Sequence, residues 1–151
     1  MRLIGFDFTK ISGEKSGKYE PEFATNTNID ITEIIEEKAE FLQNLEIVKV
    51  SFNFSITYAK KEKEEAKFGD VVLAGHLLFS SQEEEAKELL KNWKNKNEKA
   101  IPANFRIPLF NLILRKCTPK ALDLEDSLGL PFHMPLPSLG IKKESKKENK
   151  K

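Results

Sequence analysis

The side chains best suited to chemistry are few and widely spaced in this chain. Its only histidines are His76, which stands among apolar residues, and His133, which precedes Met134 in a proline-rich segment. A histidine and a thioether do not make a metal site, and an acid–base role would need convergent partners. We therefore expect both histidines to be held by hydrogen bonds and packing.

Cys117 and one acidic cluster are the remaining candidates. A lone cysteine forms no internal disulfide and no four-thiolate zinc site, so Cys117 is expected to pack as a small hydrophobe. Asp123, Glu125 and Asp126 lack the glycine and the terminal glutamate of a calcium loop. No phosphate-binding glycine pattern or nucleophile elbow is present. The sequence thus predicts no catalytic residue, no metal and no cofactor, and a protein that is not an enzyme.

Length and charge narrow the classes further. The 151 residues are expected to form one domain over residues 1–140, followed by a disordered Lys/Glu-rich tail at 141–151. The net charge of +1 argues against a nucleic-acid-binding protein, which usually carries a basic excess on one face. No apolar run is long enough for a membrane span, and the N-terminus shows no signal-peptide block. We expect a cytoplasmic protein that neither binds nucleic acid nor inserts into a membrane.

The chain is organised around one alternating stretch at residues 47–58, IVKVSFNFSITY. Because side chains alternate across a strand, this stretch is predicted to be a strand with one buried face and one wet face. The apolar row consists of Val48, Val50, Phe52, Phe54, Ile56 and Tyr58. Such a strand must lie centrally in an antiparallel sheet with a cover over its apolar side.

Three further strands are predicted from the same alternation. They span residues 2–11, 28–34 and 68–80. Residues 32–42 fit either a short helix or the continuation of a strand, and we favour a strand to 34 with a turn or short helix after it. The charged run at 60–67 is expected to be a solvated hairpin tip. The fourth strand is apolar on both faces, so we expect cover on both sides, from helices or from another subunit.

Capping signals and proline positions predict two helices after the strands. Ser81 and Glu84 fit a capping box at the start of the first helix. A proline opens the second, at residues 108–117, and Thr118-Pro119 is expected to end it. The proline density of residues 121–140 favours an extended arm. The predicted fold is α+β: a four-stranded antiparallel sheet followed by two helices on one face, with an extended proline-rich C-terminal arm.

The chain carries more apolar surface than a small domain needs. It has eleven Phe, a strand that is apolar on both faces and an apolar arm. Exposed apolar grooves bind extended peptides with little sequence preference. The same residues could equally close the protein's own core or an oligomer interface, and composition leaves both interpretations open.

Several motifs resemble the SecB export-chaperone family. NFRIP at residues 104–108 leads an apolar helix, and TPKALDL at 118–124 follows with Thr-Pro and an alternating Leu-x-Leu. FDFTKIS, EIVKVSFNFSITYA and FGDVVLAGHLLFS look like the first, third and fourth strands of that family. The resemblance is gapped, covers about residues 1–130, and is that of a divergent, archaeal-type SecB-like protein.

The resemblance implies an ATP-independent chaperone that assembles as a homo-oligomer, a dimer or a tetramer. Unfolded or nascent polypeptides would lie in apolar grooves between sheet and helix. The candidate client-binding residues are Phe6, Phe8, Phe52, Phe54, Leu109 and Phe110. The family has no catalytic residues to carry over.

The chain also departs from the family pattern. SecB is strongly acidic, which helps it dock onto the SecA motor, whereas this chain is near neutral. The helix after Pro108 is expected to be about one turn shorter, and the proline-rich arm to replace the family's last long helix. Delivery to SecA is therefore not implied. The alternative is a structural or adaptor protein that docks one specific protein partner through its arm.

Overall fold

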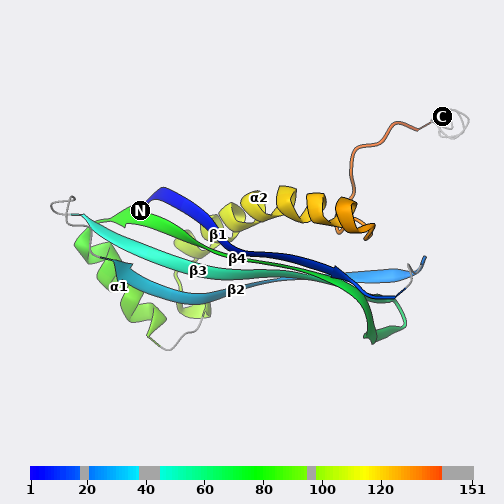
Figure 1. Cartoon of the computed structure of the whole chain (residues 1–151). Helices are drawn as coiled ribbons and strands as arrows, with labels where there is room; N and C mark the ends of the chain where they lie inside the picture. The colour runs from blue at the N-terminus through cyan, green and yellow to red at the C-terminus, as the bar shows by residue number, and fades with distance from the viewer. Residues whose placement is uncertain (18–20, 38–44, 95–97, 141–151) are drawn as a thin grey trace, which may run out of the picture.

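The chain folds into a twisted four-stranded antiparallel sheet followed by two helices (Figure 1). The computed structural model describes residues 1–17, 21–37, 45–94 and 98–140. The elements are β1 (Arg2–Lys15), β2 (Phe23–Glu37), β3 (Glu46–Lys60), β4 (Lys63–Ser81), α1 (Glu83–Trp93), a 3-10 turn (Glu98–Ala100) and α2 (Ala103–Leu128). The strand order is β1-β4-β3-β2. The predicted fold class is thereby confirmed.

β3 is the inner strand that the alternation predicts. It pairs with β2 on one side and with β4 on the other. All six residues of its apolar row, from Val48 to Tyr58, are at most 1% exposed. Burying a large apolar side chain contributes about 1.5–3 kcal/mol, so this row is a principal source of stability for the sheet.

The strands are longer than the sequence indicates. β2 begins at Phe23 and runs through residues 35–37 as strand, not as a turn or helix, while residues 38–44 lie outside the described part. The polar start of β2 is strand because its backbone pairs with β3 from Lys60 onward. β4 likewise begins at Lys63, so the β3–β4 turn is confined to Lys61 and Glu62, and the rest of the predicted hairpin tip is strand with an irregular register.

α1 forms where the sequence predicts it, but without the capping box. Its N-cap is Gln82, and no side chain caps the helix. Ser81 still belongs to β4, where it pairs with Glu46, and its hydroxyl donates to the Gln82 carbonyl at 2.9 Å. Ser81, which the sequence predicts as the helix N-cap, is therefore the last residue of β4 instead. The inward residues Ala86, Leu89 and Trp93 are buried.

α2 corrects the sequence prediction most. It begins at Ala103, so Pro108 lies inside it and does not open it. It has 26 residues and continues through Pro119, so it does not end at 117, and the extended arm begins after Leu128, not at 121. Every fourth residue is buried against the sheet: Leu109, Ile113, Cys117, Ala121 and Glu125. Helix-interior proline costs about 3 kcal/mol, and the packing of the last two turns offsets that cost. The helix that contains Pro108 is thus longer than the sequence predicts.

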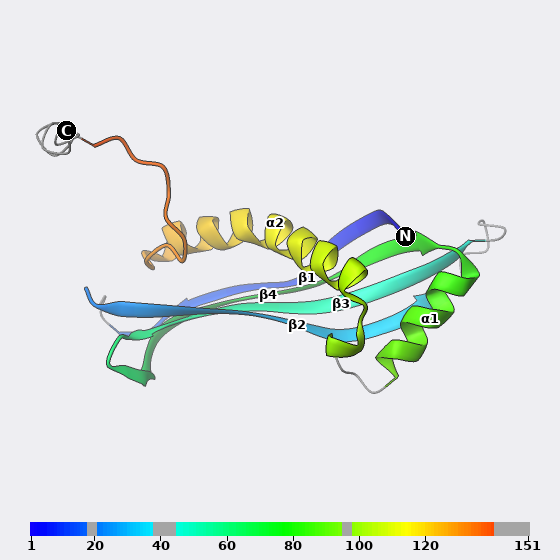
Figure 2. The ribbon, with the colours of Figure 1, turned by 180° about the vertical axis from the view of Figure 1, so that it is seen from behind.

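The end of α2 is fixed by a left-handed glycine. Gly129 has φ of 67°, a conformation that glycine adopts without a steric penalty. The Leu130 N–H donates to the Glu125 carbonyl at 2.9 Å, and the Leu130 side chain is buried. The chain turns away from the sheet at this point (Figure 2).

Both helices contribute to the core on one face of the sheet. α2 lies over β1 and β4, and α1 lies near the end of β2 and β3 (Figures 1 and 2). The opposite face of β4 carries Val72, Ala74, His76 and Leu78, all half-buried. No described segment of this chain supplies the second cover that we expected there, and a cover from another subunit stays a prediction.

The described residues contain no helix with the length and hydropathy that crossing a bilayer requires.

The helical state of the segment after Pro119 can be tested at Asp123, which is exposed. We expect Asp123→Pro to lower the free energy of unfolding by about 3 kcal/mol, because proline removes a helix-interior hydrogen bond and clashes with the preceding turn. Asp123→Ala is the matched control and should change it by less than about 0.5 kcal/mol. Equal urea midpoints for the two variants would mean that the segment is extended.

Candidate functional site

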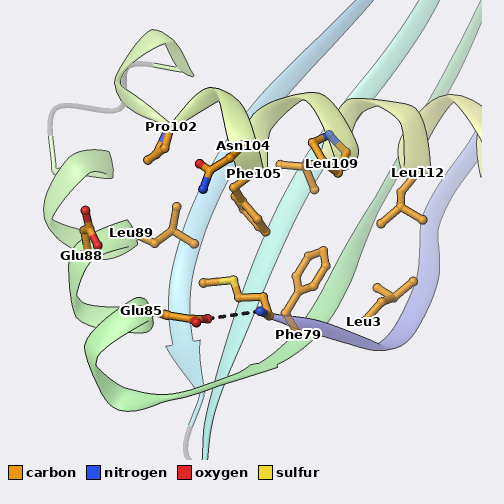
Figure 3. Close-up of a pocket in the computed structure, with 12 residues that line it drawn as sticks. Leu3, Phe79, Glu85, Glu88, Leu89, Pro102, Asn104, Phe105, Leu109 and Leu112 are labelled. Carbon is orange, nitrogen blue, oxygen red and sulfur yellow. Dashed lines mark hydrogen bonds and ion pairs between the residues drawn. The ribbon is translucent and has the colours of Figure 1, made fainter.

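A hollow of about 490 Å³ lies where the ends of β1 and β4 meet α1 and the start of α2 (Figure 3). We call it the pocket. Its lining residues are Met1, Leu3, Phe79, Glu85, Glu88, Leu89, Pro102, Asn104, Phe105, Pro108, Leu109 and Leu112. Ligand sites typically measure about 300–1,000 Å³, so the pocket can take several side chains of a guest.

The base of the pocket is apolar and well packed. Phe79 and Phe105 meet edge to face with ring centroids 5.4 Å apart, a favourable geometry for aromatic rings. Leu89 and Leu109 are buried beside them. Phe79 comes from β4, Leu89 from α1, and Phe105 and Leu109 from α2, so the pocket exists only when all three elements are docked.

One wall of the pocket is acidic. Glu85 and Glu88 project from α1, and both are exposed. The Glu85 Oε2 lies 3.1 Å from the Met1 ammonium group (Figure 3). An apolar base with a negative rim favours a guest whose apolar side chains are flanked by lysine or arginine.

An apolar row continues from the pocket along the edge strand β1. Leu3, Phe6, Phe8 and Ile11 stand opposite helix-facing residues of β4 in the ladder, and cross-strand partners share a face. We call these four residues the β1 row. Leu3, Phe6 and Phe8 are half-buried, and Ile11 is exposed. The row and the pocket together form one elongated apolar surface.

The β1 row rests on the core. Phe6 stacks on Phe52 with ring centroids 5.6 Å apart and meets Phe8 edge to face at 5.0 Å. The Lys116 Nζ lies 5.7 Å from the centre of the Phe6 ring. Gly75 allows β1 to pair closely with β4, because a Cβ there would clash with the Asp7 carbonyl oxygen and stand 3.1 Å from the Phe52 ring.

A second site lies at the far end of α2. Glu125 is fully buried, and its Oε2 accepts hydrogen bonds from the Tyr58 hydroxyl and, at 3.0 Å, from the His133 N–H. The His133 Nδ1 lies 2.8 Å from Oε1. We call Tyr58, Glu125 and His133 the carboxyl cluster. It joins the central strand, the last helix and the root of the arm.

Burial governs the proton chemistry of this region. Burial, followed by the hydrogen bond to Glu125, raises the pKa of Tyr58 well above its usual range. The hydroxyl therefore remains a hydrogen-bond donor over the whole physiological range. An unsatisfied buried carboxyl would be costly, and the cluster supplies its partners.

A chaperone is among the solved structures that share this architecture. The solved structure of the Mycobacterium tuberculosis Rv1957 SecB-like chaperone, in complex with a ChAD peptide from the Rv1956 HigA1 antitoxin, is similar to this chain with a TM-score of 0.51. The similarity covers 93% of this chain and 91% of that one at 12% sequence identity. No protein-family model and no curated protein sequence matches the chain. The fold is SecB-like.

The predicted client-binding residues divide within the SecB-like fold. Leu109 lines the pocket, and Phe6 and Phe8 belong to the β1 row. Phe52 and Phe54 are buried in the core, so a client could reach them only if the cover moved. Phe110 is half-buried and does not line the pocket. Their contact with clients stays a prediction.

Sequence reasoning missed most of the pocket lining. Leu3 and Phe79 were readable as strand residues, but nothing in the sequence showed that they meet at one end of the sheet. Phe105 stands in the NFRIP motif and was the best available signal. Glu125 was grouped with its exposed neighbours Asp123 and Asp126, although it alone is buried.

Cys117 and His76 both have structural surroundings that account for them. Cys117 is buried, and burial raises the pKa of its thiol to about 12, so it packs as a neutral small group. The His76 Nε2 lies 3.5 Å from the Asp7 Oδ2, across the β1–β4 ladder. In the described part of the chain no three His, Cys, Asp or Glu side chains are grouped to hold a metal ion.

Removal of the Tyr58 hydroxyl tests the carboxyl cluster. Tyr58→Phe leaves a buried carboxyl one donor short, and we expect the free energy of unfolding to fall by about 1–3 kcal/mol near pH 7. Folded Tyr58 keeps its proton while the unfolded residue loses it above about pH 10. The wild type should therefore lose about 1.4 kcal/mol per pH unit above that value, relative to the variant.

Urea unfolding of both proteins between about pH 8 and pH 11 measures this difference. The stability gap is present in full below pH ~10 and shrinks as the pH rises further. A gap that stays constant over the whole range would contradict the placement of Tyr58 in the cluster.

Proposed function

We propose that this protein is an ATP-independent chaperone that binds non-native polypeptide segments. The observation that carries the proposal is the continuous apolar surface formed by the pocket and the β1 row. A segment of extended chain would place side chains in the pocket and run along β1. The partners are unfolded or nascent polypeptides, encountered in the cytoplasm.

Binding by this surface is apolar burial with modest charge selection. Each large apolar side chain that a client buries contributes about 1.5–3 kcal/mol before the cost of ordering the chain. The exposed carboxylates of Glu85 and Glu88 favour segments with nearby positive charge. Clients need only rebind faster than they aggregate, so no energy source is required.

The SecB-like fold supports a polypeptide as the partner. The solved SecB-like chaperone of the same fold holds a peptide from an antitoxin. The proposed mechanism breaks and forms no covalent bond, so we expect no enzymatic turnover. We further propose that the protein works as a homo-oligomer, because the half-buried apolar residues on the uncovered face of β4 suit a subunit contact.

Leu112 provides a direct test, because it lines the pocket and is half-buried. We expect Leu112→Ser to weaken binding of a denatured client about tenfold, since an apolar contact worth roughly 1.4 kcal/mol is lost. Suppression of client aggregation, followed by light scattering, measures the effect.

The matched control is Leu114→Ser, on the same helix at an exposed position outside the pocket. It should leave suppression of aggregation unchanged. Wild-type protein that fails to protect clients even at molar excess would refute the proposal, and equal loss in both variants would refute the pocket as the site.

A second candidate function rests on the arm. Beyond His133 its apolar side chains are exposed, which fits an adaptor that docks one specific protein partner. Leu136→Ser with Leu139→Ser in the full chain separates the two functions. An adaptor loses its single partner in this variant and does not suppress the aggregation of unrelated clients, whereas a chaperone suppresses the aggregation of varied clients with or without the changes.

A further inference from the structure

The arm, defined here as residues 131–140, exposes apolar side chains on an extended backbone. The exposed fractions are 40% for Phe132, 39% for Met134, 43% for Leu136 and 106% for Leu139. Three prolines in this segment favour an extended, polyproline-like conformation. A segment that is extended before it binds loses less entropy on docking.

The carboxyl cluster holds the root of the arm. The backbone N–H and ring of His133 both contact the buried Glu125, and Leu130 packs into the core. Residues after His133 are therefore displayed from a fixed point at the C-terminal end of α2 (Figure 1). The pocket lies at the opposite end of that helix.

The two leucines of the arm cannot both enter the pocket of their own chain. Leu139 stands six positions after His133 (139 − 133), which spans about 20 Å of extended chain, and Leu136 stands three positions after it (136 − 133), or about 10 Å. The nearest pocket residue on α2, Leu112, is thirteen positions from Glu125 (125 − 112), or about 20 Å, and the lining continues away from it to Pro102, about 35 Å from Glu125. Leu136 therefore falls about 10 Å short of the pocket in its own chain.

We propose that the arm of one copy docks in the pocket of a second copy of this chain. The inference rests on the proposed function, because it uses the pocket as a site for extended apolar peptide. Leu136 and Leu139 are three residues apart, so in a polyproline-like helix of three residues per turn they project to the same side. Both can then enter the hollow of about 490 Å³ together.

Charge favours this occupant. The arm leads into residues 141–151, IKKESKKENKK, which contain six Lys and two Glu, a net charge of +4 (6 − 2). The pocket wall carries Glu88, with Glu85, which is paired with the Met1 ammonium group, beside it. The lysines that follow an arm seated in the pocket would face this acidic wall.

Arm docking gives the apolar pocket a resident ligand. A contact between two different surfaces of the same chain links copies either reciprocally in a pair or in longer series. A client with stronger apolar anchors displaces the arm, and the arm returns when the client leaves. The pocket is thus shielded from non-specific association between clients.

A labelled peptide tests the proposal on the full chain. The receptor is the full-length variant Leu136→Ser/Leu139→Ser. Both positions are exposed, and the substitutions remove the two leucines with which its own arm would compete for the pocket. The probe is a fluorescent peptide of residues 131–151, followed by fluorescence anisotropy. We expect saturable binding that weakens at least about tenfold when the same two leucines of the peptide are changed to serine.

Charge reversal locates the docking site. Glu88→Lys in the receptor should weaken the peptide about threefold or more, and added salt should reduce this difference. Glu84→Lys is the matched control, with the same charge change on the same helix but outside the pocket lining. In the wild-type chain, light scattering should give a larger mass than in the double-serine variant at equal concentration.

The outcomes separate the inference from the proposed function. A receptor that suppresses client aggregation but binds the wild-type and serine peptides equally, or neither of them, overturns arm docking and leaves the chaperone proposal in place. A receptor that binds neither clients nor the arm peptide overturns both. Equal loss in Glu88→Lys and Glu84→Lys overturns the pocket as the docking site.

Discussion

The buried carboxyl group of Glu125 is the contact on which the ends of this molecule depend. A carboxyl taken out of water needs hydrogen-bond donors, and the fold supplies them from the Tyr58 hydroxyl on β3 and the His133 N–H beyond α2. The cluster therefore ties three segments that are far apart in the sequence. It keeps α2 seated across the sheet and fixes the direction in which the arm leaves it.

The cover over the sheet is uneven, and this unevenness creates the pocket. α2 crosses β1 and β4 with one residue in every four buried, and α1 closes only the end of β2 and β3. Between the two helices the sheet edge keeps Leu3 and Phe79 within a hollow that no described side chain fills. Since β1 is also an edge strand, its apolar row continues this incomplete cover. The incomplete cover over the core thus leaves the pocket and the β1 row accessible.

The sheet and the helix count could be predicted from the sequence, because alternation and helical spacing are local signals. The length of α2 could not, since Pro119 is a strong local stop and the compensating burial of Ala121 and Glu125 is tertiary. Ser81 is likewise a strand residue and not a helix cap, because its pairing with Glu46 is a tertiary contact that the local sequence does not reveal. Of the site, Leu109 and two residues of the β1 row were among the predicted residues, whereas the pocket itself arises from the meeting of strand ends and two helices.

Because β3 is an inner strand, its apolar row is buried and cannot itself be a binding surface. Phe52 and Phe54 are buried, and Phe52 stacks on Phe6 of the β1 row, so these two residues support the surface from below and do not form it. Phe6 connects the core with the surface, because it stacks on the buried Phe52 and is itself only half-buried. A rigid base lowers the ordering cost on the protein's side of any complex. Under the proposed function, affinity for an extended apolar segment would depend mainly on the guest, and one surface could then serve both varied clients and the arm of a second copy.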